Sequence, residues 1–175
     1  MDVHSAGTYA QEGGPATAGA VRAAAELGLD LSSHAAHGLI ARDATAAELV
    51  IGMAVEHRDA IVDAAPEAAA RTFTLKELAR LANRFPPEPS VAVLAPAERL
   101  RRRVLAADRL RRDDLDPGDG YDGDDDVMDP LGMTLETYRV VAHEIDGLVE
   151  GVVGAIFGGP RVSAAGDATL EEGEP

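Results

Sequence analysis

Three polar residues in this chain are candidates for chemistry, and the most versatile is the carboxyl of Asp129, which is followed by Pro130. A carboxylic acid can donate a proton to a departing oxygen, and its ionised form can take a proton from water. Taken alone, however, an Asp-Pro pair is typical of a turn before a helix. Ser5 and His34, again taken alone, are typical of a turn serine and a loop histidine that form local hydrogen bonds.

The chain contains no cysteine. Disulfides, thiolate metal sites and a cysteine nucleophile are therefore excluded from these 175 residues. The Gly- and Asp-rich stretch over 113–128 is slightly similar to a calcium loop, because carboxylates alternate with glycines. It lacks the bidentate Glu at the twelfth position and the flanking helices of an EF-hand, so we expect a solvated loop. No metal and no organic cofactor is predicted.

The charge of the chain excludes some classes of partner. It has 16 Lys and Arg against 31 Asp and Glu, a net charge of −15, which argues against a nucleic-acid surface. The arginine-rich stretch over 98–112 is followed directly by the acidic stretch over 113–126, and we expect the two to neutralise each other. Neither a membrane span of about 20 apolar residues nor a signal peptide is visible. We therefore expect a cytoplasmic protein with no nucleic-acid or membrane partner.

Short apolar runs alternate with helical patterns along the chain. These elements would position the candidate residues. Strands are predicted over 3–6, 48–53 and 71–75, and helices over 15–27, 55–65, 76–82, 98–112 and 134–157. Thr45 and Glu48 also fit a capping box, but Val50, Ile51 and Gly52 favour a strand there. The alternation predicts an α/β fold with a parallel sheet. The last helix is expected to bury one stripe of residues: Tyr138, Val141, Ile145, Leu148, Val149, Val152 and Ile156.

One domain is expected over residues 1–158. Within it, the proline-rich start of the stretch over 84–120 indicates an insertion or variable region. Residues 159–175 turn to Gly, Pro, Glu and small side chains, which predicts a disordered tail.

Four short motifs occur in an informative order: SAGT at 5–8, LGLDLSSH at 27–34, ELVIGM at 48–53 and DPLG at 129–132. Together they resemble the low-molecular-weight protein-tyrosine-phosphatase family, which includes a group of arsenate reductases. The resemblance runs from about residue 3 to residue 157 and implies a doubly wound parallel sheet in the order 2-1-3-4. It also implies a phosphate-binding loop between the first strand and the first helix, with Cys, five residues, Arg and then Ser or Thr.

For the candidate residues, the resemblance implies specific roles. Asp129 matches the general acid, which protonates the leaving oxygen and then activates water. Ser5 and His34 match residues that brace the phosphate loop. The substrate would be a phosphorylated protein or a small phosphomonoester, hydrolysed through a cysteinyl-phosphate intermediate. His57, on the helix after ELVIGM, is expected to be a surface or capping histidine.

The family's first strand, phosphate loop and first helix have no match, because Met1 stands one residue before the segment that resembles the second strand. We therefore expect the chain to be a shortened phosphatase, inactive by itself and prone to form oligomers. The alternative is a pseudophosphatase or binding module that uses the remaining scaffold. Arsenate reduction ranks lower, because it needs cysteines that this chain lacks.

Overall fold

The computed structural model describes residues 2–86, 93–113 and 124–158. Short elements come first, and two long helices follow them. In chain order the elements are α1 (Ala18–Glu26), α2 (Ala41–Ala46), β1 (Val50–Gly52), α3 (Val55–Ala64), the 3-10 helix η1 (Pro66–Arg71), β2 (Thr72–Thr74), α4 (Leu75–Ala82), α5 (Pro96–Asp113) and α6 (Leu135–Phe157).

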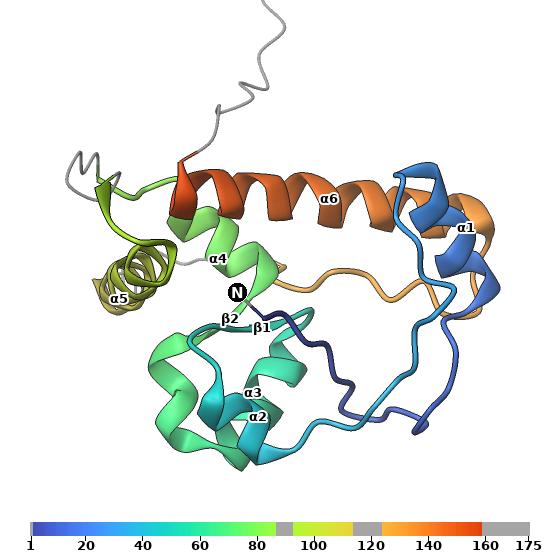
Figure 1. Ribbon diagram of the computed structural model, residues 1–175, viewed down its shortest axis with the longest axis horizontal. Helices are drawn as coiled ribbons and strands as arrows, with labels where there is room; N and C mark the ends of the chain where they lie inside the picture. The colour runs from blue at the N-terminus through green and yellow to red at the C-terminus, as the bar shows by residue number, and fades with distance from the viewer. Residues whose placement is uncertain (1, 87–92, 114–123, 159–175) are drawn as a thin grey trace, which may run out of the picture.

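The sheet of the described residues has two strands, β1 and β2, which are parallel. Val50 pairs with Thr72 and Gly52 with Thr74, and the chain crosses between the strands through α3 and η1. Helices α4 and α6 lie on one side of the strands, and α2 and α3 lie on the other (Figure 1). This arrangement confirms the predicted α/β fold, and the predicted strands over 48–53 and 71–75 contain β1 and β2.

Local signals in the sequence explain where the main helices begin. Thr74 and Glu77 form a reciprocal capping box at the start of α4. Thr134 caps α6 by accepting a hydrogen bond from the backbone N–H of Thr137. The predicted buried stripe on α6 is confirmed at Val141, Val152 and Ile156, but Val149 is 42% exposed, so its assignment to the stripe was wrong.

Helix α5 belongs to the main hydrophobic core, although it lies in the stretch expected to be an insertion or variable region. Its residues Leu100, Val104 and Ala107 are buried in one cluster with Phe73 of β2 and Val152 of α6. Burial of this apolar face anchors α5 against α4, α6 and η1.

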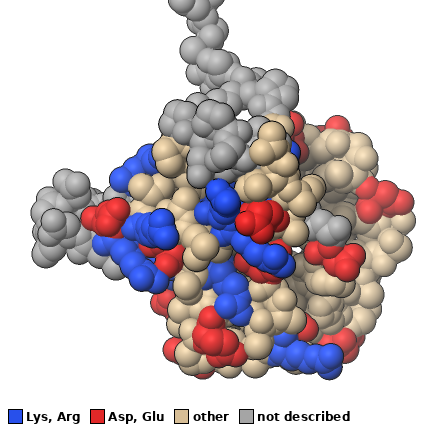
Figure 2. Space-filling view, turned by 60° about the vertical axis from the view of Figure 1, so that its left-hand side comes forward, with Lys and Arg blue, Asp and Glu red and all other residues tan. Residues whose placement is uncertain are grey.

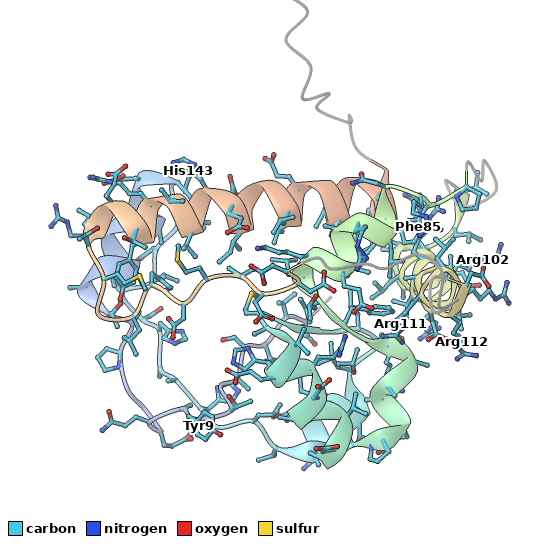
Figure 3. All side chains as sticks on the ribbon, turned by 180° about the vertical axis from the view of Figure 1, so that it is seen from behind. Tyr9, Phe85, Arg102, Arg111, Arg112 and His143 are labelled. Atoms are coloured by element: carbon cyan, nitrogen blue, oxygen red, sulfur yellow. The ribbon has the colours of Figure 1, made fainter. Side chains whose placement is uncertain are left out.

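Most of the arginines of α5 make contacts within the fold. Arg111 donates to the carbonyl oxygens of Thr72 and Ala69 and lies 4.4 Å from the ring centroid of Phe73. Arg112 pairs with Asp108 on the outer side of the helix, where Arg102 also lies (Figure 3). Arginine and acidic side chains are interspersed over this face (Figure 2). Carboxylates such as Asp108 neutralise part of the arginine charge of α5. The acidic stretch over 113–126 was expected to do so, but most of it lies outside the described residues.

One prediction about the first half of the chain was wrong. The stretch over 3–6 forms no strand; instead Gly7 makes an isolated parallel bridge with Gly38. Only two bonds support the bridge, from Gly7 N to the carbonyl oxygen of His37 and from Leu39 N to that of Gly7, both 3.0 Å. The alternative of a capped helix starting at Thr45 also fails, because Thr45 lies in α2 and its hydroxyl donates to Ala41 and Glu67. The short helices α2 and η1 were not predicted.

None of the helices in the described part of the chain combines the length and the apolar character needed to span a bilayer.

Candidate functional site

The three candidate residues, which are far apart in the sequence, line the same open pocket. Ser5, His34 and Asp129 border a cavity of about 520 Å³ between the N-terminal segment, α1 and the start of α6. Figure 1 shows α1 beside the N-terminal half of α6, where this pocket lies. The other lining residues are mostly small or apolar: Pro15, Ala16, Thr17, Ala20, Leu31, Pro130, Leu131 and Tyr138.

Asp129 is exposed and held in a tight turn. Its Oδ1 accepts a hydrogen bond of 2.9 Å from the backbone N–H of Leu131. This is the turn geometry that an isolated Asp-Pro pair predicts. Within the described residues Oδ2 has no hydrogen-bond partner, so one carboxyl oxygen is available to a ligand in the pocket.

The segment that leads to Asp129 is fixed to the sheet and to two helices. Asp126 Oδ1 accepts a bond of 2.7 Å from the first N–H of α3, at Val55, and the Val127 N–H donates to the carbonyl oxygen of Met53 at 2.7 Å. Asp125 pairs with Arg80 of α4 at 3.3 Å. These bonds determine the path of the chain as it enters the pocket.

His34 ends a turn, and Ser5 lies on an extended segment. The His34 N–H donates to the carbonyl oxygen of Leu31 at 3.1 Å. In the same turn, Asp30 accepts a bond of 2.8 Å from the Ser32 N–H, and bonds from Ser32 hold the pKa of Asp30 below its usual value. Ser5 lies on the extended segment that pairs with residues 36–39, which also carries the fully exposed Tyr9 (Figure 3).

A second hollow, of about 410 Å³, lies beside α3 and β2. None of the predicted site residues lines it, and its two arginines already pair with carboxylates: Arg58 with Asp59 at 2.9 Å and Arg111 with Asp108 at 2.8 Å. His57 lies on α3, 3.8 Å from Glu56, and does not line the first pocket. Among the described residues no group of three or more His, Asp or Glu side chains could hold a metal ion.

Comparison with known proteins identifies the family. The sequence profile described as low molecular weight phosphotyrosine protein phosphatase matches residues 1–85. The solved low molecular weight protein tyrosine phosphatase of T. tengcongensis is 31% identical, with a TM-score of 0.57. The match covers 86% of this chain and 74% of that chain. The chain belongs to the low molecular weight protein tyrosine phosphatase family.

Two comparisons within the low molecular weight phosphatases concern a protein of Geobacillus stearothermophilus. A protein-arginine-phosphatase from that organism is 27% identical over 150 residues, which is 86% of this chain and 73% of the relative. The solved structure of its YwlE arginine phosphatase is 26% identical, covers 86% of this chain and 71% of that one, and has a TM-score of 0.58. The chain therefore spans about three quarters of these phosphatases.

Three residues at or near this pocket were not singled out for the site by the sequence: Thr17 and Tyr138 line it, and Asp126 holds the segment that leads into it. Asp126 was one of many acidic residues in a stretch expected to be solvated, so the sequence gave no reason to select it. Tyr138 was expected in the apolar stripe of α6, and its hydroxyl instead accepts a bond of 3.1 Å from Thr17. A threonine before an Ala-rich helix is a helix-capping signal that could have identified Thr17.

Proposed function

We propose that this chain carries the general-acid side of a phosphomonoester hydrolase site, with Asp129 as the acid and Ser5 and His34 as the residues that brace a phosphate-binding loop. The observation that supports the proposal best is the convergence of these three side chains on one pocket. They lie 29 to 124 positions apart in the sequence, so local turn geometry alone does not require them to meet.

The reaction needs a nucleophile that these 175 residues do not contain, since there is no cysteine. In the family's mechanism a thiolate attacks phosphorus, the bond from phosphorus to the leaving oxygen breaks, and the general acid protonates that oxygen. Water then attacks the phosphocysteine, the carboxylate takes its proton, and the sulfur–phosphorus bond breaks to release phosphate. Asp129 fits both proton transfers, because Oδ2 is open to the pocket. The proposal therefore predicts that the chain alone does not hydrolyse phosphomonoesters.

The test is to compare the chain with a fusion that supplies the missing chemistry. The fusion joins the family's strand, Cys-x5-Arg loop and helix to the N-terminal end of the chain, and a Cys→Ser variant of the loop is its control. We expect no hydrolysis of p-nitrophenyl phosphate by the chain alone, measurable hydrolysis by the fusion, and none by the control. Turnover by the chain alone that Asp129→Asn abolishes would overturn the proposal, and so would a folded but inactive fusion.

A second candidate substrate is phosphoarginine, the group named for the Geobacillus relative. The lining of the pocket favours it: none of the described lining residues is Lys or Arg, and an aliphatic Leu131 follows Asp129-Pro130. The family often has an aromatic residue after the Asp-Pro pair to stack on a phosphotyrosine ring. The proton donated by Asp129 would go to the guanidine nitrogen as the phosphorus–nitrogen bond breaks. The kcat/KM ratio of the fusion on matched phosphoarginine and phosphotyrosine peptides distinguishes the two substrates.

A further inference from the structure

Tyr138 is the aromatic residue in the lining of the pocket, and it is bonded to both sides of it. It lies in the first turns of α6, where its N–H donates to the carbonyl oxygen of Thr134 at 3.2 Å. Its hydroxyl accepts a hydrogen bond of 3.1 Å from Thr17 Oγ1. Thr17 is the residue that caps α1, through a bond from the Ala20 N–H. The tyrosine therefore joins the starts of two helices across the pocket.

Short-range hydrogen bonds hold the chain between Asp129 and this tyrosine. The carboxylate accepts from the Leu131 N–H, and the Met133 N–H donates to the carbonyl oxygen of Pro130 at 2.9 Å. Gly132 has φ +79°, which a residue with a side chain rarely adopts, so the turn between these bonds depends on glycine. Thr134 then caps α6. Each bond spans two to four residues and the backbone joins Met133 to Thr134, so we expect a displacement of Tyr138 to reach the turn that holds Asp129.

The ring of Tyr138 lies against α1 because residue 19 is a glycine. A Cβ at Gly19 would lie 2.6 Å from the ring atoms Cδ2 and Cε2, a distance that real Cβ atoms do not reach. An alanine at 19 therefore forces the ring to move away from α1. Since the ring also borders the pocket, the pocket offers space into which it can move.

We propose that Tyr138 is a positioning residue: its ring, seated against Gly19, and its hydroxyl, bonded to Thr17, hold the Asp129 turn opposite Ser5 and His34. The importance of that position rests on the proposed function of Asp129, but the position itself can be tested without catalysis. Glu26 and Arg139 form a second link between α1 and α6, with contacts of 2.7–3.1 Å. This ion pair lies outside the pocket, so a variant of it serves as a control for the link through Tyr138.

The experiment is backbone amide NMR of the 175-residue chain and its variants. The Leu131 amide donates to Asp129 Oδ1, so its chemical shift reports changes in the geometry of this turn. We expect Tyr138→Phe and Gly19→Ala to shift the amide signals of Leu131 and Met133. Gly147→Ala is the matched control. Gly147 lies on α6, as Tyr138 does, and a Cβ there would meet nothing within 4 Å.

Perturbations confined to α1 and α6, with Leu131 and Met133 unchanged, would overturn the proposal. If Gly19→Ala does not fold, Thr17→Val takes its place, because it removes the hydroxyl that donates to Tyr138. Thr17→Ser keeps a hydroxyl and should restore the Leu131 and Met133 signals. Glu26→Gln should leave the amide signals of Leu131 and Met133 in place. An inactive fusion enzyme together with these NMR shifts would reject the proposed function and leave the positioning role intact.

Discussion

At the scale of single residues, Asp126 and Asp129 show how carboxylates three positions apart have different roles. Asp126 Oδ1 accepts a bond of 2.7 Å from Val55, one of the backbone N–H groups at the start of α3 that have no partner within the helix. Asp129, which lines the pocket, uses Oδ1 as an acceptor within its own turn, and its Oδ2 has no hydrogen-bond partner among the described residues. The first residue stabilises the fold, and the second is available for chemistry.

Asp126→Ala should lower the free energy of unfolding by about 1 kcal/mol, the usual effect of losing a helix cap. Asp126→Asn keeps an acceptor oxygen and should lose less. Urea unfolding of both variants measures the difference. Asp146→Ala is the matched control, because Asp146 is an exposed carboxylate on α6 with no hydrogen bond within the described residues. Equal losses from Asp126→Ala and Asp146→Ala would show that the cap contributes nothing.

At the scale of elements, the pairing of α1 with α6 positions two walls of the pocket. Glu26 of α1 and Arg139 of α6 form a bidentate ion pair at this contact. The Arg139 guanidinium holds the pKa of Glu26 below its ordinary value of 4.5. Because the pair is exposed to solvent, salt should weaken it.

The lowered pKa of Glu26 makes its contribution dependent on pH. A carboxyl with a lowered folded-state pKa stabilises the fold above its unfolded pKa, about 4.5 here, and the contribution is lost as pH falls through the folded pKa. The difference in Tm between the chain and Glu26→Gln should therefore be present at pH 7 and disappear in acid. A difference that stays constant from pH 7 to pH 3 would contradict this assignment.

Helix α6 also carries glycines that serve no visible packing purpose. A Cβ at Gly147 would meet nothing within 4 Å, and the residue is exposed within the helix. Gly147→Ala should raise the free energy of unfolding by about 0.5–1 kcal/mol, because alanine loses less backbone entropy on folding. Urea unfolding checks this value. A destabilised variant would mean that another surface packs on this part of α6.

The sequence predicted the elements with strong local signals and missed those without them. The cap at Thr134 and the apolar spacing of α6 are local features, so α6 was found, whereas the cap at Thr74 was missed and α4 was expected to begin at residue 76. Helix α2 has neither a side-chain cap nor an apolar stripe, and it is held by Arg71, which donates to carbonyl oxygens of Ala44, Thr45 and Ala47. The meeting of Ser5, His34 and Asp129 depends on the whole fold, so only family resemblance could suggest it.

At the scale of the whole molecule, the described sheet has only two strands, and Ile51 of β1 is 36% exposed. Edge strands with exposed apolar side chains tend to pair with other chains. We therefore expect the chain to associate as its concentration rises, as light scattering would show. Ile51→Lys should reduce the association, whereas Ile40→Lys, at an exposed position outside the sheet, should not. A monomer at all concentrations with sharp two-state unfolding would contradict this expectation.

The central claim is that Asp129 donates the proton to the leaving group. A general acid helps in proportion to the proton demand of the departing oxygen, whereas a structural aspartate affects all substrates equally. The most direct measurement is therefore kcat of the loop-bearing fusion and its Asp129→Asn variant over aryl phosphates of graded leaving-group pKa. We expect a loss of roughly 10²–10⁴-fold for poor leaving groups that shrinks as the leaving group improves. A uniform loss across the series would contradict the assignment.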